Sequence, residues 1–154
     1  MHIVLVEPEI PQNTGNIART CALTGSNLHL VKPLGFSVAD RYLKRAGLDY
    51  WSYVKVRLWD NFAQLEGYLT GQNFYLATTK ADHSYVDFHY QPDDVLVFGK
   101  ETKGLPREFI NSNMEKAIRI PMSKETRLRS FNLANSANIV LFEALRQLGF
   151  PNLR

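Results

Sequence analysis

The sequence predicts an α/β fold in which a mainly parallel sheet carries helices on both faces. Short apolar runs rich in β-branched residues alternate along the chain with segments whose apolar residues recur at helical spacing. Glycine and proline residues separate most of these segments, which is typical of strands and helices joined by turns. The 154 residues show neither an internal repeat nor an interdomain linker, so we expect one domain over residues 1–154.

The first half of the chain supplies strands and helices in turn. Ile3 to Val6 is a short apolar run that predicts the first strand, and two prolines stiffen the connection after it. Asn13 and Thr14 offer helix-capping side chains before an apolar helical pattern that ends at Gly25. The next elements are expected to be a strand over 28–31, a helix over 38–46 and a strand over 53–58.

The second half continues the alternation and ends in a long helix. We expect helices over 62–69 and 106–110, a loop over 81–94, and strands over 74–77, 95–98 and 117–120. From Leu133 to Leu148 the apolar residues form one continuous stripe, and Gly149 ends the helix. Ile139 and Phe142 lie off that stripe and give the helix a second apolar surface, for which a subunit interface is one explanation.

The composition is that of a globular protein with a mild basic bias. A formal net charge of +3 and a pI near 9.0 permit an anionic partner without requiring one. No apolar run reaches the roughly 18–20 residues of a membrane span, so we expect no membrane association, and no secretory signal opens the chain. The single cysteine, Cys21, excludes an intramolecular disulfide, suits the cytoplasm and falls in an apolar helical pattern that predicts a buried thiol.

Several catalytic motifs are missing from the sequence. The four histidines have no metal-ligand spacing with one another or with Cys21, so we expect no metal site. Gly99-Lys100 lacks both the earlier glycine and the following serine or threonine of a P-loop. No G-x-G-x-x-G follows the first strand and no G-x-S-x-G occurs, which argues against an ordinary dehydrogenase and an α/β-hydrolase.

Three polar segments each follow a predicted strand, at residues 13–19, 99–106 and 120–135. Because the carboxyl ends of parallel strands meet at one edge of a sheet, these segments are expected to share a crevice. Gly99 either lets a ligand approach the backbone closely or supplies an ordinary turn between strand and helix. Asn132 and Asn135, at the start of the last helix, are either helix caps or ligand contacts.

Together these segments resemble the motif set of the SPOUT-class RNA methyltransferases, a trefoil-knotted family that uses S-adenosylmethionine. The chain is most similar to the small single-domain members that methylate the ribose 2′-hydroxyl at the wobble position of certain leucine tRNAs. Each motif is weak alone, whereas the ordered set is specific. The motifs are Glu7-Pro8-Glu9-Ile10-Pro11, Asn13 to Arg19, Arg45 to Tyr50, Phe98 to Pro106, Ile120-Pro121-Met122 and Glu143-Ala144.

The resemblance implies a homodimeric enzyme with tRNA as its substrate and S-adenosylmethionine as its methyl donor. The backbone around Ala77, Gly99 and Ile120 would hold the cofactor, with Ser130 nearby. Arg19 corresponds to the family's catalytic arginine, and the alternative is a surface cation on a helix. Because a guanidinium stays protonated in proteins, we expect Arg19 to grip the target's phosphate and align the 2′-oxygen rather than to act as a base.

The basic cluster of Arg41, Lys44 and Arg45 is the candidate RNA-binding surface. The RNA target itself is not fixed by the sequence. Action on another tRNA site or on ribosomal RNA, or a non-catalytic RNA-binding role, are the alternatives. A knot between Phe98 and the last helix is predicted by the resemblance alone, because knots are essentially absent among protein folds.

The chain departs from the family pattern in three places. Phe142 stands where relatives often carry tyrosine, and the loop over 123–129 is longer than usual. Lys100 replaces a commoner neutral residue and offers an additional phosphate contact. Its neighbour Glu101 could lie beside the cofactor or pair with Lys100 or Lys103.

Overall fold

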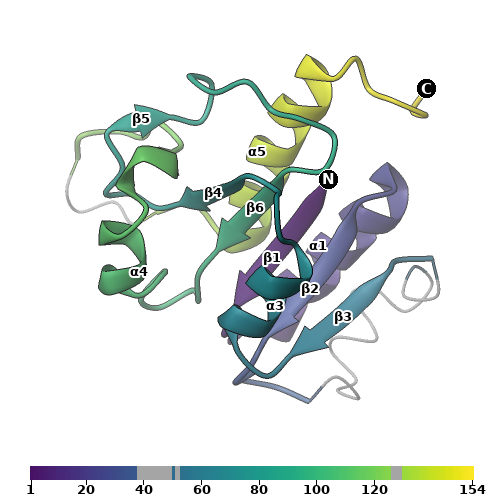
Figure 1. The fold of residues 1–154 in the computed structure, drawn as a ribbon, viewed down its shortest axis with the longest axis horizontal. Helices are drawn as coiled ribbons and strands as arrows, with labels where there is room; N and C mark the ends of the chain where they lie inside the picture. The colour runs from purple at the N-terminus through teal and green to yellow at the C-terminus, as the bar shows by residue number, and fades with distance from the viewer. Residues whose placement is uncertain (38–49, 51–52, 126–129) are drawn as a thin grey trace.

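Among the described residues, seven strands form one sheet in which every hydrogen-bonded pair of strands is parallel (Figure 1). The computed structural model describes residues 1–37, 50, 53–125 and 130–154. The strands are β1 (His2–Val6), β2 (Asn27–Val31), β3 (Val56–Trp59), β4 (Phe74–Ala77), β5 (His83–Ser84), β6 (Val95–Phe98) and β7 (Ala117–Arg119). Their order across the sheet is β3-β2-β1-β6-β4-β7-β5.

The helices begin and end where the sequence supplies capping chemistry. Helix α1 starts with a proline, which fits the first turn because its missing N–H would have no partner there, and Gly25 ends it at a φ of 70°. Helix α5 begins after Asn132, whose side-chain oxygen accepts hydrogen bonds from the first turn. The helices of the described residues are α1 (Pro11–Thr24), α3 (Phe62–Tyr68), α4 (Arg107–Asn111), α5 (Leu133–Gln147) and the 3₁₀ helix η1 (Met114–Lys116).

Among the described residues, each face of the sheet is covered by its own pair of helices. Successive strand side chains point to opposite faces, so Ile3 and Leu5 pack with α1 and α5 in one hydrophobic cluster. Val4 and Val6 pack with α3 and α4 in a second cluster. Figure 1 shows α1 and α5 behind the sheet and α3 in front of it. The predicted α/β fold, with its parallel sheet and helices on both faces, is confirmed.

The chain changes direction across the sheet beside β1. From β1 it runs outward through β2 to β3 and then crosses to β4 on the other side, and β6 later inserts between β1 and β4. In an open parallel sheet, a crevice forms outside the carboxyl ends of the strands at such a switch point. The segments that follow β1 and β6 therefore meet at this crevice.

Most of the predicted elements are confirmed, and three are corrected. The third strand begins at Val56, because the backbone N–H of Tyr53 bonds to the carbonyl of Tyr50 in a turn. The predicted loop over 81–94 contains β5, a two-residue strand paired with β7 that is too short to show an alternating pattern. Asn13 and Thr14 lie inside α1 rather than capping it, because the helix begins two residues earlier.

Two predictions concern segments that lie wholly or partly outside the described residues. The helix expected over 38–46 lies outside the described residues. The segment expected to form a knot includes residues 126–129, which also lie outside them, so the knot stays a prediction. The prediction for Cys21 is confirmed, because the side chain is buried and burial raises the pKa of its thiol to about 12.

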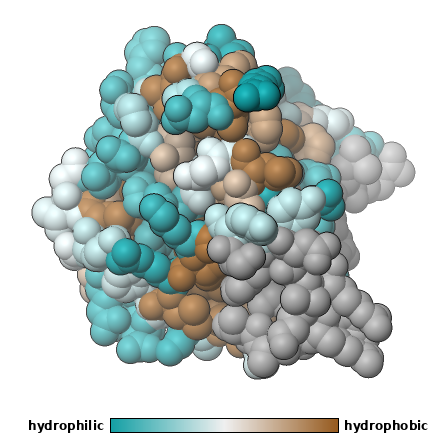
Figure 2. All heavy atoms as spheres, turned by 90° about the vertical axis from the view of Figure 1, so that its right-hand side faces the viewer, coloured by the Kyte–Doolittle hydropathy of each residue, from teal (hydrophilic) through white to brown (hydrophobic). Residues whose placement is uncertain are grey.

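Large hydrophobic side chains also remain on the surface. Leu23 of α1 is 61% exposed and Phe142 of α5 is 48% exposed. Hydrophobic residues gather in several patches on the face shown in Figure 2, beside the residues drawn in grey. Within the described ranges, no helix has the length and apolarity that crossing a membrane requires.

Candidate active site at the carboxyl edge of the sheet

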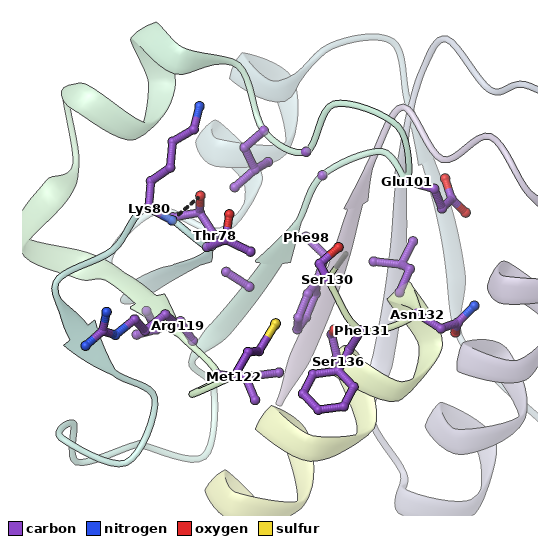
Figure 3. Close-up of a pocket in the computed structure, with 18 of the residues that line it drawn as sticks. Thr78, Lys80, Phe98, Glu101, Arg119, Met122, Ser130, Phe131, Asn132 and Ser136 are labelled. Carbon is purple, nitrogen blue, oxygen red and sulfur yellow. Dashed lines mark hydrogen bonds between the residues drawn. The ribbon is translucent and has the colours of Figure 1, made fainter. Parts of the chain in front are cut away.

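A cavity of about 1010 Å³ opens beside the carboxyl ends of β4, β6 and β7 and the start of α5 (Figure 3). Its walls come mainly from residues 77–80, 98–105, 118–125 and 130–133. The four residues predicted to hold the cofactor, Ala77, Gly99, Ile120 and Ser130, all line it. The fold therefore brings four residues that are distant in the sequence to one cavity.

The lining of this cavity combines apolar side chains with polar and charged ones. Phe98 and Val140 belong to the hydrophobic core beneath it, and Figure 3 shows Ser130 and Ser136 close to Phe131. The ends of three neighbouring strands also present backbone amides and carbonyls at this edge. Apolar side chains beside backbone groups that are held at strand ends are typical of a small-molecule site.

Gly99 occupies a position where no side chain fits. A Cβ placed on Gly99 would overlap backbone atoms of Gly104 and Leu105. The loop between them folds back on itself, since the N–H of Gly104 donates to the carbonyl of Lys100 at 2.8 Å and Gly104 has a φ of 68°. The glycine is required by this close approach of two backbone segments, which forms one wall of the cavity.

Glu101 binds the segment that follows β1. Its carboxylate accepts hydrogen bonds from the backbone N–H of Glu9 at 2.8 Å and of Ile10 at 3.2 Å. The carboxylate of Glu9 in turn accepts from the backbone N–H and hydroxyl of Thr102. The two loops are therefore joined by reciprocal carboxylate contacts, and Glu101 pairs with neither Lys100 nor Lys103 among the described contacts.

Asn13 connects this pair of loops to α5. Its side-chain amide donates to Glu101 at 2.9 Å, and its carbonyl oxygen accepts from the side chain of Asn132 at 2.8 Å. Asn132 also caps α5 by accepting from the N–H of Ala134 at 2.9 Å, so it is a helix cap and a connection at once. Asn13 is 5% exposed and, in this arrangement, satisfies its buried polar atoms within the protein.

Lys100 forms an ion pair beside the cavity. Its ammonium lies 2.6 Å from a carboxylate oxygen of Glu7, and this hydrogen bond raises the pKa of the lysine. Glu7 itself has a φ of 52°, a left-handed conformation that is uncommon for a residue with a side chain. A phosphate contact by Lys100 would have to compete with this ion pair.

Arg19 lies on α1, away from the cavity wall. Its side chain is exposed, and its guanidinium lies over the ring of Tyr50 with Cζ 4.7 Å from the ring centroid. Arg19 is not among the described residues that line the cavity. The fold therefore separates the predicted catalytic arginine from the four predicted cofactor residues of its own chain.

Four cations line the mouth of the cavity, and the sequence analysis did not group them because they come from separate segments of the chain. All four are exposed, and none has a side-chain ion pair with another described residue. These four cations are Lys80, Lys103, Arg119 and Lys124.

The predicted RNA-binding residues Arg41, Lys44 and Arg45 lie outside the described residues.

Comparison with known proteins gives a consistent result along the chain. The model of the SpoU rRNA Methylase family matches residues 1–142. The tRNA (cytidine(34)-2'-O)-methyltransferase of Methylovorus glucosotrophus is 48% identical over 149 residues, which cover 96% of this chain and 96% of that protein. The protein of the same name from Photorhabdus asymbiotica is 47% identical over 97% of this chain and 95% of its own length.

Solved structures give the same result for the fold. A structure from work on the 2-OH methylation of C/U34 on tRNA matches with a TM-score of 0.90 at 42% identity, covering 96% of this chain and 95% of that one. The methyltransferase AviRb of Streptomyces viridochromogenes, in complex with the cofactor AdoMet, matches with a TM-score of 0.83 over 100% of this chain and 59% of its own. At 22% identity, this second likeness concerns the fold alone.

Proposed function

This chain belongs to the SpoU rRNA methylase family, and on that premise we propose that it methylates tRNA at the ribose 2′-hydroxyl of the wobble nucleotide. The methyl donor is S-adenosylmethionine, and the target is cytidine or modified uridine 34 of leucine tRNAs. The observation that carries the proposal is identity near 48% to a C34 methyltransferase over nearly the whole of both chains. Residues 1–154 act as one methyltransferase domain, in the cytoplasm.

The cavity supports the assignment of the donor site. Backbone groups at Ala77, Gly99 and Ile120 can pair with the edge of an adenine, and the apolar wall at Phe98 and Val140 can cover its ring. Ser130 offers a hydroxyl to the same cavity. When bound there, S-adenosylmethionine would supply a methyl group activated by its positive sulfur.

The chemistry of Arg19 suits binding and alignment. A guanidinium stays protonated, so Arg19 is not the proton acceptor. Its planar N–H groups match the oxygens of a phosphate, and holding the target phosphate would fix the 2′-oxygen in line with the methyl group. Its guanidinium has no hydrogen bond or ion pair with the described residues, which leaves its donors available for RNA.

A homodimer would place Arg19 at a cavity. Arg19 does not line the cavity of its own chain, so the site is complete only if a second copy supplies this residue. Helices α1 and α5, which carry Arg19 and the wall residue Val140, pack side by side and also expose Leu23 and Phe142. Burying these apolar side chains between two copies would bring the arginine of one to the cavity of the other.

Mixed dimers test the shared site. Arg19→Ala removes the arginine, and Ser130→Trp fills the cavity from an exposed position, so each variant is inactive alone. If the arginine acts across the interface, an equal mixture regains about a quarter of the wild-type rate, because half of the dimers are mixed and each has one intact site. No recovery in mixtures shown to exchange subunits would place Arg19 in the same chain as its cavity.

The activity is tested with labelled S-adenosylmethionine and bulk tRNA, followed by mapping of the methylated nucleotide. Label at position 34 of leucine isoacceptors is the expected result. Label at another tRNA position or in ribosomal RNA would instead make the chain a ribose methyltransferase with a different target. A third possibility is a non-catalytic RNA-binding role, and calorimetry with S-adenosylhomocysteine tests for it. Absence of binding would leave only that role. Substituting Arg41, Lys44 and Arg45 together should weaken tRNA binding without changing that calorimetric affinity.

A further inference from the structure

Tyr50 is in contact with the residue on which the proposed methyl transfer depends. The Cζ of Arg19 lies over its ring, 4.7 Å from the centroid, which is within the range of a cation–π interaction. The backbone of Tyr50 has one described hydrogen bond, since its carbonyl accepts from the N–H of Tyr53 at 2.9 Å. Val54, which follows Tyr53, is 8% exposed and belongs to the core cluster beneath α1.

A different partner would leave Arg19 less able to bind RNA. Arg146 shows the alternative, because its Nε and Nη2 both donate to the carboxylate of Glu143 at 2.8 Å. Those hydrogen bonds help to lower the pKa of Glu143 to about 2, and they occupy two donors of the guanidinium. An aromatic ring contacts the flat face of a guanidinium instead, so every N–H of Arg19 stays free to donate.

We propose that Tyr50 is a positioning residue for methyl transfer, and that its ring fixes the plane of the Arg19 guanidinium so that the N–H edge meets the target phosphate. The inference rests on the proposed function. An exposed arginine has many rotamers, and each must be lost before the phosphate is aligned. A ring that holds one orientation before RNA binds removes part of that cost, which appears in the rate of transfer.

The test compares Tyr50→Leu with Tyr50→Phe in the full chain. Tyr50→Leu should lower the single-turnover rate about fivefold or more, whereas Tyr50→Phe, which keeps the ring, should retain most of it. The dissociation constant for S-adenosylhomocysteine and the Tm should stay close to those of the wild type in both variants. Tyr68→Leu is the matched control, because it removes a second cation–π pair, with Arg57 at 4.5 Å, on the other face of the sheet.

Whether the effect of Tyr50→Leu depends on Arg19 is measured in a chain that already carries a substitution at Arg19. In Arg19→Lys, whose rate should remain measurable, adding Tyr50→Leu should cause little further loss, because lysine has no guanidinium plane for the ring to position. An equal loss in both backgrounds, or the same loss for Tyr50→Phe as for Tyr50→Leu, overturns the proposal. A wild-type chain that methylates no RNA refutes the proposed function itself, whereas a methylating wild type with an unaffected Tyr50→Leu refutes only the role of Tyr50.

Discussion

The polar side chains that the proposed reaction needs fall into two sets, and they differ in what they bind. Glu101, Asn13 and Asn132 have their polar atoms engaged by other parts of the protein. The Arg19 guanidinium lies over a ring and has no hydrogen bond or ion pair with the described residues, and the cations at the cavity mouth have no described ion pair. The first set joins the loop after β1, the loop after β6 and the start of α5, and the second set faces outward.

This difference separates the shape of the site from its contacts with RNA. A carboxylate that already accepts three hydrogen bonds gains little from a ligand but holds two loops at a fixed distance. A cation without a partner is free to bind an anion. Substitutions in the first set should therefore change stability and cofactor binding, and substitutions in the second should change RNA binding and turnover.

Arg19→Lys is expected to give the largest effect. Lysine keeps the charge but loses the planar fork, so turnover should fall about 100-fold, as for other removed transition-state donors. The dissociation constant for S-adenosylhomocysteine should change less than about twofold, because the proposed partner of Arg19 is the target phosphate and not the cofactor. Rapid-quench methylation and calorimetry measure the two quantities.

The control for this substitution is Arg107→Lys, an exposed arginine on α4 that is not among the described residues lining the cavity. It should leave both quantities unchanged. A loss of cofactor affinity in Arg19→Lys would mean that the arginine belongs to the set that shapes the cavity.

Gly99→Ala should produce the next effect, and it acts on stability. The new Cβ would overlap the backbone of Gly104 and Leu105, which cannot move like a flexible side chain. We expect the free energy of unfolding to fall by about 3 kcal/mol, with loss of cofactor binding as the loop is displaced. Gly67→Ala is the matched control, because nothing lies near its Cβ and the helix should gain about 0.5–1 kcal/mol. Urea unfolding distinguishes the two, and equal stabilities would refute the assigned role of the close approach.

Glu101→Gln tests the connection between the loops with little change of size. The amide would turn an N–H donor toward the N–H of Glu9 or Ile10, leaving one of them unsatisfied at a cost of about 2 kcal/mol. Cofactor affinity should weaken together with stability, since the carboxylate holds one wall of the cavity. Glu108→Gln, at an exposed position on α4, should change neither quantity. A variant with full stability but no turnover would instead make Glu101 a participant in the reaction.

Periodicity predicted most of the fold because the sheet and its helices are stabilised by repeating apolar contacts. The alternation of Ile3, Val4 and Leu5 between two core clusters is a local pattern that a strand requires. β5 was missed since two residues cannot show alternation. The placement of Ala77, Gly99, Ile120 and Ser130 on one cavity followed from the resemblance, together with the rule that parallel strand ends converge.

The contacts that shape the site depend on tertiary structure and left no local pattern. Glu101 and Glu9 are 92 positions apart, and Asn13 and Asn132 are 119 positions apart. Neither contact could be predicted from the spacing of residues in the sequence. Glu101 therefore had only the cofactor or its lysine neighbours as candidate partners. Tyr50 belonged to a recognised motif, but its contact with Arg19 depends on where α1 lies.

The last expected effect leaves the site untouched and comes from a hydrogen-bonded group on the face of the sheet that α3 and α4 cover. Trp59 donates to Nδ1 of His29 at 3.0 Å, so the proton of His29 is on Nε2, which lies 2.9 Å from Nδ1 of His2. Burial, then His2 and Arg57, lower the pKa of His29 to about 4, and burial also lowers that of His2.

Acid should therefore destabilise the fold without acting on the crevice. Below the ordinary histidine pKa of 6.5 the unfolded chain takes up protons that the folded chain refuses, so stability is highest above pH 6.5 and falls toward pH 4. Between pH 7 and 5 the loss should be about 2 kcal/mol in urea unfolding. His29→Gln should flatten this slope, whereas His89→Gln, at an exposed position, should preserve it. If the slope persists in His29→Gln, the acid sensitivity arises from other groups, and the polar contacts on this face do not limit stability.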